Sequence, residues 1–349
     1  MNAPLTDRKA TNFEVDFLRR MPKVELHVHL EGAISPSTIR TMAARNNVTL
    51  PVSEGELENF FKFRDFDHFL EAYYAATSTM LTLEDWRLMI DQFMADRREQ
   101  NIVYSEVFVS ASHHLQRYDH DEWIRVLSES IGEGEERYGV RIRLIPDISR
   151  EVPETSRPVL DFVTKAWENG VALGIGLGGP EQGFPPELFT DVFAEAKQAG
   201  MHVVAHAGET EGAASVRGAW NGLGAERIGH GLRVLEDPDL THDMAAARVP
   251  FEVNPTSNYC IGVVSQDSPH PIRGMIDSGL VVTVNSDDPA LFGNSLAQEF
   301  QLLIEQGFEL EELWKLNLDA IGASFLNETE KETLTQQFCV FHTENSGGR

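Results

Sequence analysis

The sequence has little cysteine and little positive charge. Its 349 residues include two cysteines, and 29 lysines and arginines against 55 aspartates and glutamates. Cys260 and Cys339 do not form a C-x-x-C pair, so neither a disulfide framework nor a cysteine zinc knuckle is indicated. The net charge of -26 repels nucleic-acid phosphates and anionic membranes, and it favours a neutral or cationic small substrate over a phosphorylated one.

Long hydrophobic runs are also missing. No uninterrupted apolar run approaches the roughly 20 residues of a membrane-spanning helix. The first residues, MNAPLTDRKATNFEVDF, contain no apolar segment typical of a secretory signal. The composition is 42% hydrophobic and 24% charged, which is typical of a globular protein with a large core and not of a disordered chain. Together these features predict a cytoplasmic protein.

Short β-rich apolar runs alternate with longer segments of helical periodicity, such as residues 121–136 and 186–199. Several of the runs are nearly continuous, as expected for strands buried on both faces. The expected strands are Val24–His29, Val103–Val109, Arg141–Pro146, Ala172–Leu177, His202–His206, Arg227–Gly229, Pro250–Val253 and Val281–Ser286. Eight such strands predict an α/β fold, a TIM (β/α)8 barrel formed by residues 1–349 as a single domain.

The segment between the first two expected strands is unusually long. It is expected to carry extra helices at Pro36–Asn46, Ser53–Phe61, Phe66–Thr79 and Leu83–Arg98. Ser35 and Pro36 have the residue types of an N-cap and a first helical position. An insertion after the first barrel strand lies on the face of the active-site loops, so the helical insertion at about 36–98 can form a lid.

Three phenylalanines recur in this insertion with a spacing of three residues. Phe63, Phe66 and Phe69 share one side of a helix at that spacing, and ordinary core packing is the commoner use of such a pattern. A lid helix also packs its apolar side over a ligand, so the two interpretations overlap. We expect Phe63 and Phe66 to contact the substrate.

A pair of histidines lies at the end of the first expected strand. His27 and His29 are two residues apart, so on a strand both imidazoles project to the same side. They lie at the carboxyl end of the strand, where barrel enzymes place their sites, and together they can chelate a divalent metal. An H-x-H pair alone is weak evidence, because most such pairs are incidental.

His206 strengthens this interpretation. It ends the apolar run Val203–Ala205 at another expected strand terminus, so a third imidazole can converge on the first two. Glu209 follows on the loop that leaves the strand, where its carboxyl group can reach the pocket and move protons without binding the metal. Taken alone, Glu209 would be interpreted as a solvated loop carboxylate.

Two further strand ends carry polar residues. His230 stands between two glycines, which are expected to leave room for a ligand. Asp287 and Asp288 follow the last apolar run, and adjacent carboxylates repel each other unless a cation or a donor lies between them. One of them can therefore complete a metal shell while the other faces the substrate. The motifs H-x-H, HAGE, GHG and DDP end the first, fifth, sixth and eighth expected strands, and this joint pattern predicts a metal-dependent active site.

With these motifs the chain resembles the adenosine deaminase family of the amidohydrolase superfamily. The matching stretches span about Met21 to Ala323 and are PKVELHVHLEG, GIGLGGPE, VVAHAGET, ERIGHG, VNPTSN and VTVNSDDP. The resemblance implies a TIM-barrel hydrolase that deaminates a 6-aminopurine, with one zinc ion per subunit.

The resemblance also implies roles for individual residues. Glu209 would protonate the ring nitrogen beside the attacked carbon, and His230 would orient and deprotonate the attacking water. Asp288 would hydrogen-bond purine N7, and the Gly179 N–H would donate to N3. His29 and Glu31 would also line the substrate site. The zinc ligands would be His27, His29, His206 and Asp287.

The resemblance indicates the identity of the 6-aminopurine less clearly than it indicates the reaction. Adenosine-using members commonly have aspartate, which meets the ribose, at the position of Glu31. Glutamate there is common in adenine and aminodeoxyfutalosine deaminases, the latter belonging to menaquinone synthesis, and Asn254 stands where many relatives have cysteine. The stretch LGGPE instead resembles the nucleoside-using branch. We therefore expect conversion of adenosine to inosine and ammonia, with aminodeoxyfutalosine and then adenine as alternatives.

Other classes of protein fit less well. Amide or ester hydrolysis on this barrel usually needs a second metal and a lysine carboxylate on the fourth strand, which here ends in GLGG. A second class of zinc deaminases is marked by the motifs H-x-E and P-C-x-x-C. Its metal site requires a cysteine pair that this sequence lacks. A relative without enzymatic activity should lack one of the metal ligands or the acid Glu209. This sequence contains all four predicted metal ligands and Glu209. The ligand set would also accept cobalt or iron, and the sequence does not predict an oligomeric state.

Overall fold

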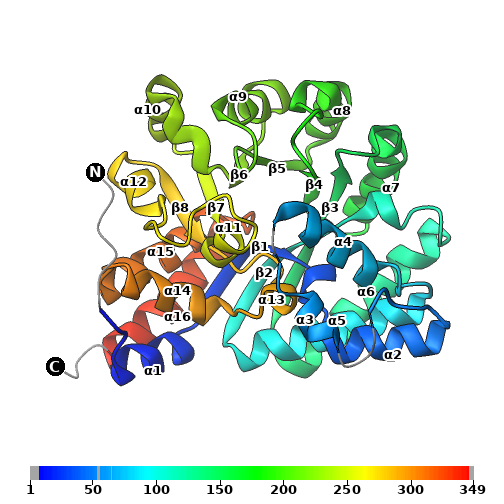
Figure 1. The fold of residues 1–349 in the computed structure, drawn as a ribbon, viewed down its shortest axis with the longest axis horizontal. Coiled ribbons are helices and arrows are strands. Elements are labelled where there is room, and N and C mark those ends of the chain that lie inside the picture. Colours follow the sequence, from blue (N-terminus) through cyan, green and yellow to red (C-terminus); the bar gives the residue numbers. More distant parts are fainter. Residues whose placement is uncertain (1–7, 53–55, 64, 346–349) are drawn as a thin grey trace.

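The computed structural model describes residues 8–52, 56–63 and 65–345, apart from the side chain of Glu58. Eight parallel strands follow one another in chain order, each paired with the next. Figure 1 shows the strands at the centre of the molecule with helices arranged around them. The strands are β1 (Lys23–His29), β2 (Ile102–Val109), β3 (Arg141–Ser149), β4 (Gly174–Gly178), β5 (His202–Ala207), β6 (Arg227–His230), β7 (Pro250–Val253) and β8 (Val281–Val284). All eight expected strands are present with ends shifted by a few residues at most, which confirms the predicted TIM barrel.

The barrel closes between β1 and β8 at the carboxyl ends of the strands. Val28 and Asp287 form a parallel bridge there. The His29 N–H donates to the Asp287 carbonyl oxygen at 2.8 Å, and the Asp287 N–H donates to the His27 carbonyl oxygen at 3.2 Å. The Asn285 side chain accepts the His27 N–H at 3.2 Å. Closure of the barrel therefore brings Asp287, a predicted metal ligand, beside the two histidines of β1.

The two faces of β1 separate core residues from site residues. The whole strand is buried, and Leu26 and Val28 belong to the main hydrophobic core. The alternate residues His27 and His29 face the barrel interior, where both rings contact the ring of Phe108. The period of two along a strand therefore places both imidazoles on one side, as predicted.

The helices surround the barrel. They are α1 (Asn12–Arg20), α2 (Pro36–Asn46), α3 (Leu57–Phe60), α4 (Phe66–Thr77), α5 (Leu83–Glu99), α6 (His120–Tyr138), α7 (Ser156–Glu168), α8 (Thr190–Ala199), α9 (Ala213–Arg217), α10 (Pro238–Ala247), α11 (Pro255–Cys260), α12 (Ile272–Asp277), α13 (Pro289–Phe292), α14 (Leu296–Glu305), α15 (Leu310–Ala323) and α16 (Glu328–Asn345). In the part of the chain that the structure describes, none of them has both the length and the apolar character needed to cross a membrane.

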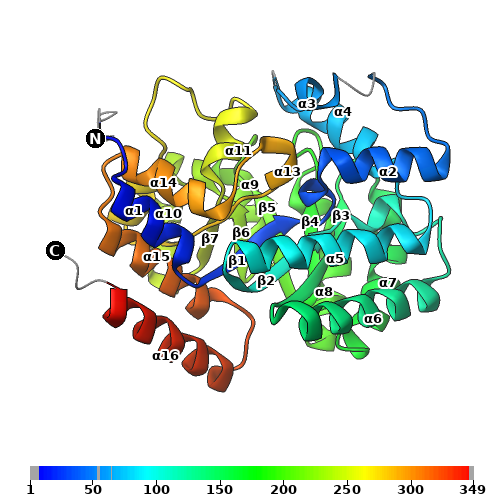
Figure 2. The ribbon, with the colours of Figure 1, turned by 90° about the horizontal axis from the view of Figure 1, so that it is seen from below.

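Helices α2 to α5 form the insertion between β1 and β2. As predicted, Ser35 is the N-cap of α2, its hydroxyl accepts the Thr38 N–H at 3.2 Å, and Pro36 occupies the first turn. The predicted helix Ser53–Phe61 is present as the short α3, and residues 53–55 of that prediction lie outside the described residues. Figure 2 shows α3 and α4 along the upper edge of the molecule and α16 along the lower edge.

Candidate active site

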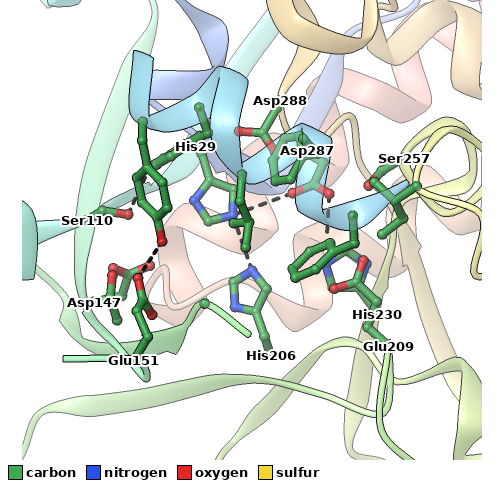
Figure 3. A pocket seen from close by; sticks show the side chains of 18 of the residues that line it. His29, Ser110, Asp147, Glu151, His206, Glu209, His230, Ser257, Asp287 and Asp288 are labelled. Atoms are coloured by element: carbon green, nitrogen blue, oxygen red, sulfur yellow. Dashed lines mark hydrogen bonds and ion pairs between the residues drawn. The ribbon is translucent and has the colours of Figure 1, made fainter. Parts of the chain in front are cut away.

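A cavity lies at the carboxyl ends of the strands. Its walls include residues at or just after strand ends, such as His29 and Gly179, and residues of α4, such as Phe66 and Phe69. Figure 3 shows His29 and His206 at the middle of the polar groups that surround the cavity. The insertion after β1 therefore supplies one wall of this cavity.

The four predicted metal ligands converge here. Ligand atoms of His27, His29, His206 and Asp287 all lie within 4.8 Å of one another. The Nε2 atoms of His29 and His206 are 3.1 Å apart, and His27 Nε2 is 3.3 Å from Asp287 Oδ1. Among the described residues, the buried His27 Nε2 has no hydrogen-bond partner. Three imidazole nitrogens and one carboxylate around a common centre are a suitable donor set for a divalent transition metal.

Hydrogen bonds behind the histidines determine which ring nitrogen faces this centre. The Nδ1–H of His206 donates to the Leu177 carbonyl oxygen at 3.0 Å, and that of His27 donates to Glu252 Oε2 at 2.8 Å. With Nδ1 protonated, Nε2 of a neutral ring carries the lone pair that binds a metal. Although burial opposes a charge, the carboxylates of Asp287 and Glu252 raise the pKa of His27 to about 10, which shows that their negative charge favours a proton or another cation at this point. The residues present therefore fit a metal ion.

Two of the functional residues have left-handed backbone conformations. His230 has a φ of 58° and Asp287 a φ of 64°, values that residues other than glycine rarely adopt. His230 ends β6, and Asp287 lies shortly after β8. The unusual conformation turns the backbone away from the strand direction at the point where each side chain enters the site.

The glycines beside His230 do not have the predicted role. A Cβ atom at Gly229 would lie 2.8 Å from Cε1 of the His27 ring, and one at Gly231 would lie 2.3 Å from the Phe251 ring. Both glycines therefore make room for side chains of the protein and not for a ligand.

Glu209 and His230 are in contact beside the predicted metal ligands. His230 Nδ1 lies 3.1 Å from Glu209 Oε1, and His230 Nε2 lies 3.8 Å from Asp287 Oδ2. Burial, reinforced by the charges of Asp287 and Glu181, raises the pKa of Glu209 well above its usual range, so this carboxyl group holds a proton that it can donate. Burial lowers the pKa of His230 to about 3, so its ring is neutral, and the Asn258 side-chain amide lies 3.1 Å from its Nδ1. The arrangement pairs an acid with a base.

Sequence reasoning gave no role to Glu181, which holds the loop that carries Glu209. Its Oε1 accepts the backbone N–H groups of Glu209 and Thr210, each at 2.9 Å. Its Oε2 accepts the Gly208 N–H at 2.8 Å and the Ser215 hydroxyl at 2.5 Å. Glu181 lies in the stretch GIGLGGPE, but nothing in that motif indicates that its carboxylate binds a loop after the next strand.

Asp288 faces the cavity. Its Oδ1 atom is buried and has no hydrogen-bond partner among the described residues. A Cβ atom at Gly32 would overlap the Asp288 carboxyl group, so glycine is needed there to accommodate it. Burial and the charge of Asp287 raise the pKa of Asp288 well above its usual range, and a neutral carboxyl group can donate a hydrogen bond to a ligand.

Glu31, predicted to contact the substrate, is not among the described residues of the cavity wall. It is fully buried and begins a short 3-10 turn directly after β1. Its Oε1 accepts the Ser110 N–H at 2.9 Å and lies 3.4 Å from His114 Nε2. Of these residues, Ser110 lines the cavity. The turn points the Glu31 side chain towards the end of β2.

The two phenylalanines predicted to contact substrate have different positions. Phe66 lines the cavity, as does Phe69. Phe63 packs edge-on against Phe69 and Phe292, with ring centroids 5.4 and 5.5 Å away, and is not among the described residues of the cavity wall. Asp65 caps α4, so Phe63 precedes the helix and the helical spacing relates only Phe66 to Phe69.

Two acidic residues of the cavity wall were missed. Asp147 and Glu151 come from the end of β3 and the turn after it, and both line the cavity. Figure 3 shows them together on one side of His29 and His206. No spacing in the sequence distinguishes them from ordinary loop carboxylates. Gly179, predicted to present its N–H to the substrate, lines the same cavity with a φ of 80°.

Both the sequence and the structure of this chain are similar to those of known deaminases. The sequence model of the family described as adenosine deaminase matches residues 22–339. An adenine deaminase of Streptomyces coelicolor is 36% identical over 320 residues, which cover 90% of this chain and 94% of that protein. An adenine deaminase of Vibrio parahaemolyticus is 33% identical with the same coverage of both chains. The crystal structure of adenine deaminase from Arthrobacter aurescens superposes with a TM-score of 0.87 at 31% identity, covering 93% of this chain and 99% of that one.

Proposed function

This chain belongs to the adenosine deaminase family and is a hydrolase that deaminates a 6-aminopurine, and we propose that its substrate is the free base adenine. The similar proteins of Streptomyces coelicolor and Vibrio parahaemolyticus are named adenine deaminases. Adenine therefore replaces adenosine, which the family motifs had placed first. The products are hypoxanthine and ammonia.

The position of Glu31 is the observation that favours the free base. In relatives that use adenosine, an aspartate at this position meets the ribose. Here Oε1 accepts the Ser110 N–H, while Oε2 is buried and has no hydrogen-bond partner among the described residues. Glu31 is not among the described residues that line the cavity, so its carboxylate is set back from a sugar attached to the purine.

The charge of the cavity wall supports a substrate without phosphate. Among the described residues that line the cavity there is no lysine or arginine. The same wall contains the carboxylate of Glu151, whose pKa lies below its usual range. A phosphate group would meet this carboxylate and find no lysine or arginine to pair with, so a nucleotide fits poorly.

We further propose one zinc ion per chain, bound by His27, His29, His206 and Asp287. The donor set and the free lone pairs at Nε2 suit zinc. When bound, zinc supplies the Lewis acidity that makes a water molecule a reactive nucleophile at neutral pH.

Glu209 and His230 move the protons in this proposal. His230 accepts a proton from water as the water oxygen bonds to C6, while Glu209 donates its proton to N1. The amino group leaves as ammonia with the second water proton, the C6 carbonyl forms, and N1 keeps its hydrogen. The 3.1 Å contact between His230 Nδ1 and Glu209 Oε1 gives a route for the first proton to return to Glu209. General acid–base catalysis of this kind contributes about 10²–10⁴-fold.

Asp288 and Gly179 hold the purine ring in the same proposal. The neutral carboxyl group of Asp288 donates to N7, and the Gly179 N–H donates to N3. Phe66 covers the ring from the side of α4.

A side-by-side assay tests the proposal. Purified protein with zinc is incubated with adenine, adenosine and aminodeoxyfutalosine, and ammonia release and the change in near-ultraviolet absorbance are measured. We expect kcat/KM for adenine to exceed that for adenosine by at least about 100-fold, because contacts at a polar site can discriminate to this extent. A preference for either nucleoside would overturn adenine as the substrate, and no turnover of any 6-aminopurine would overturn the function.

A further inference from the structure

We propose that Glu151 accepts a hydrogen bond from N9–H of the purine and thereby selects a base that is unsubstituted at N9. This inference rests on the proposed function and adds to it a residue that determines specificity.

One oxygen of Glu151 is held by the protein and the other is left free. Oε1 accepts the Tyr74 hydroxyl at 2.5 Å and lies 3.3 Å from His113 Nε2. Oε2 is buried and has no hydrogen-bond partner among the described residues, although Glu151 lines the cavity. A buried carboxylate oxygen without a partner is costly, so a donor from a bound molecule would stabilise this oxygen.

The free oxygen lies next to Gly179. A Cβ atom placed on Gly179 would come within 2.4 Å of Glu151 Oε2, so the Gly179 backbone and this oxygen are close neighbours. The cavity wall therefore offers a backbone segment and a carboxylate acceptor side by side.

The shape of the purine matches this arrangement. In the ring, N3 and N9 are both bonded to C4 and form one edge, while C6 and N1 lie on the other side of the molecule. Figure 3 shows Glu151 on one side of His29 and His206, and Glu209 and His230 on the other. A purine with C6 and N1 towards Glu209 and His230 thus turns its N3–N9 edge to Gly179 and Glu151. In the free base that edge carries an acceptor and an N–H donor.

The ionisation of Glu151 suits an acceptor. Burial alone would raise its pKa, but the hydrogen bonds from His113 and Tyr74 hold the pKa of Glu151 below its usual range. The neighbouring Asp147 differs, because burial and the charges of Glu31 and Glu151 raise the pKa of Asp147 well above its usual range. Of Asp147 and Glu151, therefore, only Glu151 is an ionised carboxylate, which accepts hydrogen bonds and does not donate them.

A substituent at N9 removes this interaction. A 9-substituted purine has no N9–H, so the buried oxygen would stay unpaired and would face the substituent. Sites that hydrogen-bond a substrate group reject analogues without it far more strongly than apolar pockets reject an added methyl group.

The test compares adenine with 9-methyladenine for wild-type protein, Glu151→Gln and Glu154→Gln. The exposed Glu154 lies in the same turn and is the matched control. We expect Glu151→Gln to lower kcat/KM for adenine about 10- to 100-fold, the range for a lost hydrogen bond to a charged group. The value for 9-methyladenine should change less than about 3-fold, because that substrate makes no such bond. Glu154→Gln should leave both values unchanged.

The outcomes separate the inference from the proposed function. Equal loss on both substrates would show that Glu151 only supports the fold through Tyr74 and His113, and wild-type activity on 9-methyladenine equal to that on adenine would also overturn the inference. Wild-type protein that deaminates no 6-aminopurine would overturn the proposed function, and the inference with it.

If Glu151→Gln does not fold, calorimetric binding of hypoxanthine and 9-methylhypoxanthine to wild-type protein replaces it. The methylated compound should then bind at least about 10-fold more weakly, and equal binding would overturn the inference.

Discussion

Glu181 accepts the backbone N–H of Glu209 at 2.9 Å, so one buried carboxylate positions the residue proposed as the general acid. The same carboxylate also holds the N–H groups of Gly208 and Thr210. The loop after β5 therefore wraps around a side chain that comes from the turn after β4. The proposed role of Glu209 depends on this contact because proton transfer requires the carboxyl group to lie within hydrogen-bonding distance of the purine.

Replacing Glu181 should slow catalysis without removing the metal. Glu181→Gln has one acceptor oxygen in place of two, so at least one loop N–H loses its partner and the loop shifts. We expect kcat to fall about 10- to 100-fold with KM changed much less, since a small misplacement of a catalytic group can cost about that much. Steady-state kinetics and the metal content would check this. The exposed Glu187 provides the control Glu187→Gln, which should have no effect. A variant of Glu181 with unchanged kcat would contradict the positioning role.

Glu209→Gln should keep the metal and lose nearly all activity. The amide cannot donate a proton to N1 in the way a carboxylic acid can, and a loss of about 10²–10⁴-fold in kcat is expected. Elemental analysis of the purified variant measures the metal, and single-turnover assays measure the rate. Loss of metal together with activity would instead place Glu209 among the metal ligands.

Removal of the metal should abolish activity and reduce thermal stability. Chelation leaves the buried Nε2 atom of His27 without a partner and removes a ligand that binds only the folded chain. At a free zinc concentration about 1,000 times its Kd, binding stabilises the folded state by about 4 kcal/mol. Calorimetry of chelated and zinc-restored protein would show this as a reversible shift of Tm. Full activity after complete chelation would contradict the proposed chemistry.

Asp85 should make the stability of the insertion depend on pH. It caps α5 by accepting the N–H groups of Thr82 at 2.7 Å and Leu81 at 3.0 Å, and it also accepts the Asn46 side chain at 2.8 Å. Although burial opposes the charge, hydrogen bonds from Arg45, Thr82 and Asn46 hold the pKa of Asp85 below its usual range. This stabilisation is therefore present above the unfolded-state pKa of about 3.9 and is lost as the pH falls through the lower folded-state pKa.

The variant Asp85→Asn should lower the free energy of unfolding by about 2 kcal/mol at pH 7, since charge-assisted hydrogen bonds are lost. The difference from wild-type protein should shrink as the pH falls below about 4, because the wild-type carboxylate then becomes protonated. Urea denaturation over a pH series measures both effects. Glu84→Gln, an exposed neighbour in the same helical turn, is the control. A difference that stays constant down to acid pH would contradict the role of the charge.

Several elements could be predicted closely because prolines and strand periodicity are local signals. The helix Pro36–Asn46 and the strand Pro250–Val253 have the predicted bounds. In each case proline is the first residue, where its fixed φ and missing N–H are tolerated. The convergence of His206 with His27 and His29 was predicted because the carboxyl ends of parallel strands share one face of a barrel.

The sequence by itself thus determined the barrel, the set of predicted ligands and the acid beside them, because each follows from spacing within a strand or from a strand end. Only the tertiary structure decided where Glu31, Glu151 and Glu181 point. Each of these glutamates is oriented by partners from other segments of the chain, such as the Ser110 N–H, the Tyr74 hydroxyl and the loop at Glu209. Spacing along one strand or helix carries no information about such contacts, so the sequence could predict the proposed metal site but not the wall that we propose selects the purine.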